Sequence, residues 1–421
     1  MGIIFLVILG VPIAVAAGIC GFAGLLFLLG WGPAAGMVGM VPYATTASYG
    51  LSVIPLFLIL GQLAYYGGFT EALYKIFHHL FGRFKAGLPA ATVGACAAMA
   101  ATSGSTLATA TLMGKIAVPE MRKYGYSVGL STGVVAASGT LATLIPPSVS
   151  LVVYAILTEQ SVGKLLLAGF IPGIFSAALY VLFLTGWCEW REKPAPPKEA
   201  MRWKVFFEER YAIGVPIIIL IIMGSIYFGI GTPTEAAGLG TFGAFLLVLI
   251  AGQMTLTRLH EAAIDAVLST TMVFTIIFGV LIFARFLAYA GFIEAVSNWI
   301  MSLQVPRMVI FIGILAIYLF LGCFISGLGM LMLTLPIVFP AVMALGFDPI
   351  WFGVIVVKMT EIGLITPPMG ITVYGVASVN PDISVSTVFK GAAPFLLVDT
   401  LTVVILIVFP QIVLFLPRLA G

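Results

Sequence analysis

Small hydroxyl residues and glycines stand in this sequence where an ordinary membrane helix would carry leucine. The segment SGST begins at Ser103, directly after the apolar run 90–101, and continues with Gly104, Ser105 and Thr106. Hydroxyl and backbone carbonyl oxygens suit a hard cation such as Na⁺, and the amides of a helix N-terminus suit an anionic group. These residue types therefore favour the binding of a small cation, an anion or both.

Comparable groups recur at three further places in the chain. Two of them contain a Pro-Pro pair, which interrupts the hydrogen-bond ladder of a helix. The groups are Ser138-Gly139-Thr140 followed by Pro146-Pro147, then Ser326-Gly327, and then Gly363 and Thr366 followed by Pro367-Pro368, Gly370 and Thr372. Any one of them is explained equally well by close helix packing, which small residues permit. Four breaks at related places favour a functional role.

The elements that must position these groups are membrane helices. The chain of 421 residues is 61% hydrophobic and 8% charged, whereas soluble domains are roughly 25% charged. The net charge of +3 disfavours a nucleic-acid surface. Candidate spans are 3–29, 50–67, 89–119, 128–157, 164–187, 212–230, 236–251, 269–290, 307–345, 349–378 and 393–416. The sequence thus predicts an all-α polytopic membrane protein.

Two of these spans, 89–119 and 307–345, are too long for a single crossing and are broken in the middle. A re-entrant helical hairpin explains both features. Its non-helical tip must be buried in protein or line a wet cavity, because lipid cannot satisfy free backbone groups. Each hairpin is followed by a broken helix, at about 128–157 and 349–378. The two pairs predict two cation sites with a substrate site between them.

The two halves of the chain are related. GFTEA at Gly68 matches GFIEA at Gly291, and both this pair and Ser103/Ser326 are 223 residues apart. Basic residues flank the first hairpin but hardly the second, which indicates opposite orientations in the membrane. We therefore predict two inverted repeats, 1–187 and 231–421. They are separated by 188–230, a basic cytoplasmic linker with one unpaired crossing helix.

The remaining polar residues give weaker signals. Lys358 and Glu361 lie three apart on one helix face and are expected to neutralise each other. Arg285 is expected either to reach the membrane surface or to bind a substrate carboxylate, and Glu235 to cap a helix after Pro233. Further expectations place Asp265, Asp382 and Asp399 at membrane interfaces, His78 and His79 on an interfacial amphipathic helix, and the four cysteines in packing roles. Motifs of hydrolases or ATP-driven enzymes are not found, so an enzyme is not expected.

The ordered motifs SGSTLATATLMGKIAVPEMRKYGY, ASGTLATLIPPSVSLVVYA, GTPTEAAGLG and EIGLITPPMGITVYGVA resemble the large membrane subunit of TRAP (tripartite ATP-independent periplasmic) transporters. The resemblance extends over nearly the whole chain. It implies an elevator-type transport domain plus scaffold in the bacterial inner membrane, driven by Na⁺. It also implies a separate small four-helix membrane subunit, a periplasmic substrate-binding protein, and an organic-acid substrate such as sialic acid or a C4-dicarboxylate.

The resemblance further implies site residues. The first Na⁺ site would use Ser103, Gly104 and Ser105 with Ser138, Gly139 and Thr140, and the second would use Ser326, Gly327 and Gly329 with Gly363, Thr366 and Gly370. The substrate cavity would be lined by Thr106, Pro147, Pro368 and Thr372. The main alternative is a stand-alone Na⁺/dicarboxylate carrier without a binding protein. A membrane enzyme and a passive channel are weaker alternatives.

Overall fold

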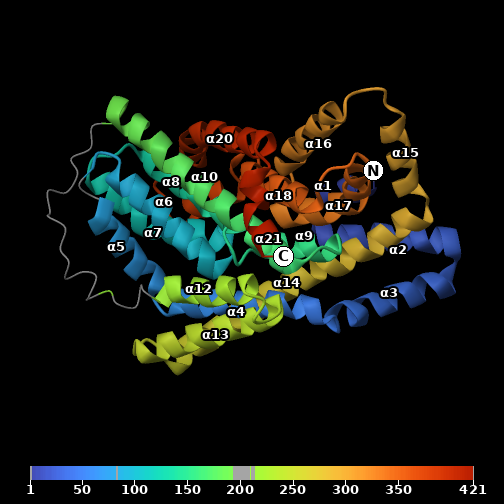
Figure 1. The fold of residues 1–421 in the computed structure, drawn as a ribbon, viewed down its shortest axis with the longest axis horizontal. Helices are drawn as coiled ribbons and strands as arrows, with labels where there is room; N and C mark the ends of the chain where they lie inside the picture. Colours follow the sequence, from blue (N-terminus) through green and yellow to red (C-terminus); the bar gives the residue numbers. More distant parts are fainter. Residues whose placement is uncertain (1, 82–83, 193–208, 210–213, 421) are drawn as a thin grey trace.

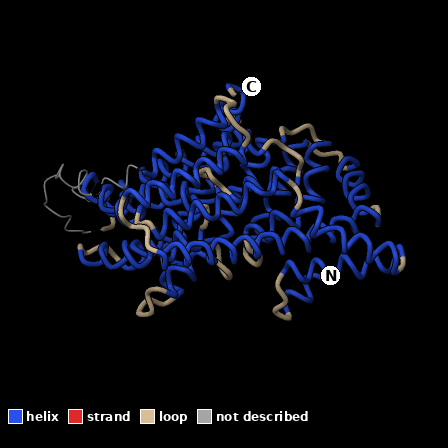
Figure 2. Tube along the Cα trace, turned by 90° about the horizontal axis from the view of Figure 1, so that it is seen from below, coloured by secondary structure: helices blue, strands red, loops and turns tan. Residues whose placement is uncertain are grey.

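The computed structural model describes residues 2–81, 84–192, 209 and 214–420 (Figure 1). These described residues form helices joined by short loops, and none of them lies in a strand (Figure 2). The predicted basic linker falls mainly on 193–208 and 210–213, which lie outside the described residues.

In the first half the helices follow in this order: α1 (Gly2–Ile8), α2 (Ile13–Leu29), α3 (Trp31–Thr46), η1 (Tyr49–Ser52), α4 (Val53–Tyr66), α5 (Phe69–Phe81), α6 (Gly87–Ser103), α7 (Thr106–Lys123), α8 (Val128–Gly139), η2 (Thr140–Thr143), α9 (Val149–Leu157) and α10 (Val162–Trp190). The second half contains α12 (Gly214–Tyr227), α13 (Pro233–Ile250), α14 (Leu256–Tyr289), α15 (Phe292–Ser302), α16 (Arg307–Gly322), α17 (Gly327–Ala344), α18 (Pro349–Ile365), α19 (Ile371–Ser378), α20 (Val385–Val408) and α21 (Gln411–Leu419).

The predicted fold class is confirmed. Helices α6 and α7 form the first hairpin, and α16 and α17 form the second. The first broken helix is α8, η2 and α9, and the second is α18 and α19. Among the described residues, six helical stretches are long and apolar enough to cross a membrane, the longest being Leu256–Tyr289.

The ends of the chain differ from the predicted spans. A single helix over 3–29 is wrong, because the chain turns at Gly10 and Pro12, both of which interrupt helical backbone geometry. The span 393–416 is likewise divided between α20 and α21. Helix α3 was not predicted at all, because several glycines and two prolines reduce its apolar signal.

Glycine sets the turn of the first hairpin. Gly104 ends α6 with φ +57° and ψ 8°, a left-handed conformation that residues with a Cβ adopt only with strain. Ser105 then caps α7, its Oγ accepting a hydrogen bond from the Ala108 amide at 3.3 Å. At the second tip the chain turns between Gly322 and Gly327 without a left-handed glycine.

Close backbone contacts connect the elements. A Cβ placed on Gly133 of α8 would lie 2.1 Å from the carbonyl oxygen of Gly391 in α20. The backbones of these two helices, one from each half of the chain, are therefore in direct contact. A Cβ on Gly279 of α14 would lie 1.9 Å from the carbonyl oxygen of Ala14 in α2. Figure 1 shows α2, α3, α4, α12, α13 and α14 along one side of the hairpins and broken helices. The molecule thus has a long flanking layer against a core that contains both repeats' breaks.

The predicted cap at Glu235 is confirmed. Thr232 and Glu235 form a capping box in which the Thr232 amide donates to the Glu235 carboxylate at 2.7 Å. Large apolar side chains remain exposed on the outer helices, with Phe27 and Trp190 both 90% exposed. Such a surface suits lipid rather than water.

Candidate functional site

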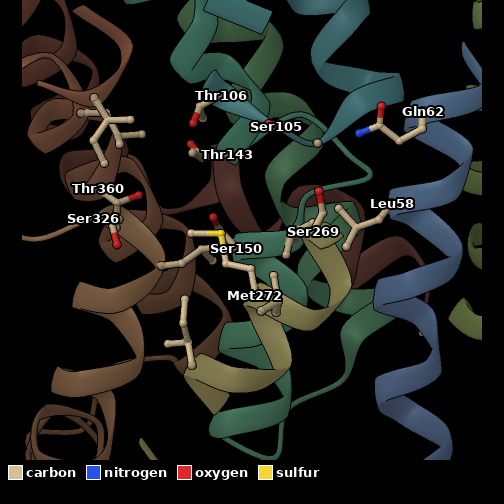
Figure 3. A pocket seen from close by; sticks show the side chains of 18 residues that line it. Leu58, Gln62, Ser105, Thr106, Thr143, Ser150, Ser269, Met272, Ser326 and Thr360 are labelled. Atoms are coloured by element: carbon tan, nitrogen blue, oxygen red, sulfur yellow. The ribbon is translucent and has the colours of Figure 1, made fainter. Parts of the chain in front are cut away.

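A cavity of about 210 Å³ lies where the two hairpin tips meet the flanking layer (Figure 3). Helices α4 and α14 supply one wall, and the hairpin tips and broken helices supply the other. The polar residues of its lining are Gln62, Ser105, Thr106, Thr143, Ser150, Ser269, Ser326 and Thr360. Among the described residues that line this cavity, none carries a charge. An ionic ligand here would meet hydroxyls, amides and helix dipoles only.

The first hairpin tip lies against the first broken helix. Gly104, Ser105 and Thr106 all line the cavity, and a Cβ on Gly104 would lie 3.0 Å from the carbonyl oxygen of Pro147. Pro147 itself is buried behind the tip. Because α7 begins at Thr106, its N-terminal amides are at the cavity edge.

The second hairpin tip repeats this placement with a different capping arrangement. Ser326 and Gly327 line the cavity at the start of α17, and a Cβ on Gly327 would lie 3.1 Å from Thr360 Cβ in α18. Unlike Ser105, Ser326 makes no side-chain capping bond to the described residues of its helix. The Ser326 hydroxyl is therefore available at the cavity.

The group Ser138-Gly139-Thr140 is buried where α8 ends. The Oγ of Ser138 has no hydrogen-bond partner among the described residues, whereas Thr140 Oγ1 donates to the Ala137 carbonyl at 2.7 Å. Gly139 packs against Ala110 of α7. Ser103 is the last residue of α6, but its side chain lies outside the described part of the structure. A buried hydroxyl oxygen without a partner is one that a cation could occupy as a ligand.

The corresponding residues of the second repeat are used mainly for packing and local hydrogen bonds. Gly363 is in backbone contact with Gly322, since a Cβ on Gly363 would lie 2.7 Å from Gly322 Cα. Thr366 donates to the Ile362 carbonyl at 2.6 Å, and Gly370 begins α19 with φ +41°.

The structure therefore gathers only some of the predicted site residues around the cavity. The predicted residues in its lining are Gly104, Ser105, Thr106, Ser326 and Gly327. Among the described residues, the other predicted ligands and three of the four predicted substrate contacts lie outside this lining. Pro147 is buried, Pro368 is exposed, and Thr372 donates to the Leu364 carbonyl across the break at 2.9 Å.

Several lining residues were not predicted from the sequence. Thr143 and Ser150 flank the first Pro-Pro pair, and their closeness to it was the available signal. Gln62 and Ser269 come from the opposite wall, on α4 and α14 (Figure 3). Gln62 is a single polar residue in an apolar span, and Ser269 begins a short Ser-Thr-Thr run; neither pattern distinguishes a cavity from a helix contact.

A buried ionic cluster lies behind the cavity. The Lys358 ammonium contacts the Glu361 carboxylate, as predicted, and it also donates to Asp399 Oδ1 at 2.7 Å and to Ser176 Oγ at 2.6 Å. The expectation that Asp399 is interfacial is wrong. Its side chain is 0% exposed, because α20 packs onto α18 and α10 at this level and Lys358 supplies its counter-charge. Tyr180 adds a hydrogen bond to Asp399 Oδ1 at 2.7 Å.

The other charged residues lie away from the cavity. Arg285 donates to the Met37 carbonyl at 3.2 Å, between α14 and α3. Exposed Asp382 pairs with Arg122 at 2.6 Å, and this hydrogen bond lowers the pKa of the Asp382 carboxyl. Asp265 accepts a hydrogen bond from the Tyr66 hydroxyl at 2.7 Å.

Comparison with known proteins assigns the family. A family described as "Tripartite ATP-independent periplasmic transporter, DctM component" matches residues 1–412. A C4-dicarboxylate TRAP transporter large permease protein of Pseudomonas aeruginosa is 32% identical over 380 residues, which is 90% of this chain and 88% of that protein. A sialic acid TRAP transporter large permease protein of Vibrio cholerae is also 32% identical, over 88% of this chain and 87% of the relative.

A sialic acid TRAP transporter permease protein of Haemophilus influenzae is similar in identity, at 32%, but the matched region is 88% of this chain and only 60% of that protein. Among solved structures, the Alcanivorax borkumensis YdaH transporter aligns with a TM-score of 0.63 over 91% of this chain and 90% of its own, at 14% identity. That likeness concerns the fold alone.

These findings confirm the predictions of a transporter rather than an enzyme and of a multi-pass protein of the inner membrane, in agreement with the six apolar helices among the described residues. Both the long family match and the relatives of 32% identity lead to one assignment. The chain belongs to the DctM family, the large membrane permeases of tripartite ATP-independent periplasmic transporters.

Proposed function

We propose that this chain is the permease of a binding-protein-dependent importer that moves an organic anion together with Na⁺ by an elevator motion. The observation that carries the proposal is the meeting of both hairpin tips at one uncharged cavity, with the first residues of α7 and α17 in its lining.

The electrostatics of the cavity favour an anion. Each helix N-terminus carries the equivalent of about half a positive charge, and two of them face the same space at Thr106 and Gly327. The hydroxyl of Ser150 offers a hydrogen bond to a carboxylate, whereas those of Thr143 and Thr360 already donate within the protein. With no charged side chain among the described lining residues, bound Na⁺ would supply the remaining positive charge.

Oxygen ligands for Na⁺ are available beside the cavity. The buried and unpartnered Oγ of Ser138 supports the first predicted site, together with Gly104 and Ser105 at the tip. The uncapped hydroxyl of Ser326 supports the second. Hydroxyl and carbonyl oxygens fit a hard cation, so the residues present are compatible with Na⁺ as the coupling ion.

The substrate class follows from the relatives. Their names specify C4-dicarboxylate, sialic acid, isethionate and 2,3-diketo-L-gulonate transport. All four compounds are organic acids, which agrees with an anion site built from helix N-termini. We therefore propose an organic acid, with sialic acid and C4-dicarboxylates as the first compounds to test.

The two walls of the cavity suggest how it could open to both sides. Leu58 and Gln62 on α4, and Ser269 and Met272 on α14, belong to the flanking layer, whereas the tips belong to the hairpins (Figure 3). In the proposed motion the hairpins and broken helices slide against this layer and carry the cavity with them. Each predicted repeat, 1–187 and 231–421, would then supply one hairpin and one broken helix to the moving part and the remaining helices to the flanking layer.

The decisive experiment is uptake into proteoliposomes containing this chain with the small four-helix subunit and the periplasmic binding protein of the same transporter. Sialic acid and C4-dicarboxylates are tested with and without an inward Na⁺ gradient. Accumulation that requires both the binding protein and Na⁺ supports the proposal. Na⁺-driven accumulation without the binding protein would favour the stand-alone carrier, and uptake indifferent to Na⁺ would refute Na⁺ coupling.

A matched pair of variants tests the second cation site within the same assay. Ser326→Ala removes the cavity hydroxyl, while Ser302→Ala removes an exposed hydroxyl of α15 that donates only to the Trp299 carbonyl. The Na⁺ concentration for half-maximal uptake should rise about tenfold in Ser326→Ala, equivalent to about 1.4 kcal/mol. It should stay unchanged in Ser302→Ala. Equal values for both variants would remove Ser326 from the site.

A further inference from the structure

Another cavity, of about 490 Å³, continues the cavity at the hairpin tips along the same helices. Helices α4, α7 and α14 contribute to the lining of both. The lining passes from Gln62 to Tyr65 on α4, from Thr106 to Leu112 on α7, and from Ser269 to Arg258 on α14. At about 1.5 Å per residue these steps are about 5, 9 and 16 Å long. The Arg258 cavity, as we name this space, therefore follows the tip cavity between the first hairpin and the flanking layer.

The Arg258 cavity lies on the basic side of the tip cavity. Helix α7 leads away from the tip at Thr106 and ends with Arg122 and Lys123 in its last turn. Helix α5, which also lines the Arg258 cavity, contributes Lys75 to it. Basic residues collect on the cytoplasmic side of membrane proteins. The Arg258 cavity is thus expected to face the cytoplasm.

Four charged residues line the Arg258 cavity, and two of them neutralise each other. The Lys75 ammonium is paired with the Glu209 carboxylate at 2.6 Å. The other two, Arg258 and Glu71, have no salt-bridge partner among the described residues. Arg258 is therefore the unpaired cation in the lining that follows the uncharged tip cavity.

The guanidinium of Arg258 is held in place, yet most of its donors are free. Its Nη1 donates to the Gln253 carbonyl oxygen at 2.9 Å and to Gln253 Oε1 at 2.7 Å. Its Nε and Nη2 make no hydrogen bond to the described residues, and the side chain is half-buried. Two adjacent N–H groups of a guanidinium match the two oxygens of a carboxylate. Arg258 thus offers a positioned carboxylate-binding group to this cavity.

Two further lining residues determine how strongly an anion would be held. The hydroxyl of Tyr65 makes no hydrogen bond to the described residues, so it can donate to an anion in this cavity. Glu71 repels an anion, although it lies in the first turn of α5, where the helix dipole favours its own negative charge. Attraction by Arg258 together with repulsion by Glu71 predicts weak binding. Weak binding suits a site that a ligand must leave.

We propose that the Arg258 cavity is a release site on the cytoplasmic side, in which Arg258 and Tyr65 bind the carboxylate of the transported acid after it leaves the hairpin tips. The acid passes from a cavity that offers helix N-termini and hydroxyls to one that offers a guanidinium. The place of this site in the transport cycle rests on the proposed function, whereas anion binding at Arg258 does not.

Chemical protection of arginine in the purified full-length chain tests the anion site without transport. Phenylglyoxal modifies free guanidinium groups, and peptide mass spectrometry follows Arg258 and the exposed control Arg418 separately. Succinate, N-acetylneuraminate (a sialic acid) or uncharged succinamide is added at constant ionic strength. If an acid binds with a dissociation constant of about 1 mM, about 9 mM of it leaves about one tenth of Arg258 free and slows its modification about tenfold.

The modification of Arg418 should not change in the same samples, and succinamide should protect neither arginine. Modification of Arg258 at the same rate with and without both acids, or equal protection by succinamide, would overturn the anion site.

A tyrosine variant shows whether the protecting acid lies in the Arg258 cavity. Tyr65→Phe removes the free hydroxyl, so the acid concentration for half-maximal protection of Arg258 should rise about three- to tenfold, the effect of one hydrogen bond. The matched control Tyr289→Phe removes an exposed hydroxyl at the far end of α14 and should leave that concentration unchanged. An unchanged concentration in Tyr65→Phe would place the acid elsewhere and would overturn the proposal.

The role in release is tested by restoring charge in proteoliposomes that contain the complete transporter. Arg258→Cys should slow maximal uptake. Aminoethyl methanethiosulfonate, which attaches an ammonium group to the cysteine, should restore much of the rate, whereas sulfonatoethyl methanethiosulfonate, which attaches a sulfonate, should not. The treated wild type controls for the four native cysteines, and exposed Lys390→Cys controls for a cation elsewhere.

Equal uptake by Arg258→Cys after the two reagents would overturn the role in release. Absence of uptake by the wild type would count against the proposed function alone, because the protection of Arg258 does not need transport.

Discussion

Replacing Ser138 with alanine should affect stability less favourably in the presence of Na⁺ than in its absence. The Ser138 Oγ is buried and has no hydrogen-bond partner among the described residues. Leaving a buried polar group unpaired costs about 1–3 kcal/mol. Without Na⁺, Ser138→Ala should therefore be as stable as the wild type or more stable by up to that amount. Most serine hydroxyls in helices would give the reverse result.

The presence of Na⁺ should shift the comparison in favour of the wild type. A ligand that binds only the folded protein stabilises it by about 2.7 kcal/mol at a concentration 100 times its dissociation constant. If the loss of one oxygen ligand weakens binding about tenfold, about 1.4 kcal/mol of that stabilisation disappears. The Na⁺-induced rise in melting temperature should be correspondingly smaller in Ser138→Ala.

The assay is thermal unfolding of the purified chain in detergent over a Na⁺ titration, with choline replacing Na⁺ at constant ionic strength. Ser131→Ala is the matched control, because Ser131 is buried in the same helix but donates to the Ser127 carbonyl at 2.9 Å. It should lose stability at every Na⁺ concentration and keep the full Na⁺ response. A full Na⁺ response in Ser138→Ala, or a loss of stability without Na⁺, would refute the reasoning.

Further substitutions test the ionic cluster, the first hairpin tip and a surface pair. Lys358→Met should lower the free energy of unfolding by about 3–5 kcal/mol, because two buried carboxyl groups lose their partner. Lys390 is exposed, so Lys390→Met should change this free energy little. Equal unfolding midpoints for the two variants would contradict the buried pairing. Gly104→Ala should lower the free energy of unfolding by about 1–2 kcal/mol, because Gly104 has a left-handed backbone conformation, and should reduce uptake. Gly186 has open space around it, so Gly186→Ala should leave uptake unchanged. Normal uptake by Gly104→Ala would argue against a rigid tip. The pKa of Asp382 is lowered by its arginine partner. The stability difference between the wild type and Asp382→Asn, measured by thermal unfolding, should therefore be complete above about pH 4 and should shrink as the pH falls through the lowered pKa. A difference that grew in acid would contradict the ion pair.

The sequence was most informative about breaks in the helices. Proline pairs, glycines and small hydroxyl residues act on the backbone locally, so the hairpin 89–119 and the broken helix 128–157 are recovered as α6–α7 and α8–η2–α9 nearly at the predicted bounds. The same residue types led the prediction to miss helix α3. Its glycines and prolines resemble loop composition, although packing against α2 and α14 stabilises the helix.

The site was less predictable because it depends on contacts between distant segments. Asp399 joins Lys358 across 41 residues and Tyr180 across 219, and no local pattern marks either pairing. Gln62 and Ser269 reach the cavity only because α4 and α14 form its second wall. Conversely, Pro368 resembles Pro147 in sequence, yet one is exposed and the other buried.

That difference between two related prolines bears on the proposed elevator motion. Residues 145–148 of the first break are buried, while 367–369 of the second are exposed. Two halves with matching sequence motifs therefore differ in conformation here. If the proposed motion exchanges the two conformations between the halves, as in transporters built from inverted repeats, the opposite state would have the first break exposed and the second buried. The conformation of each break in this structure therefore predicts the conformation of the related break in the opposite state.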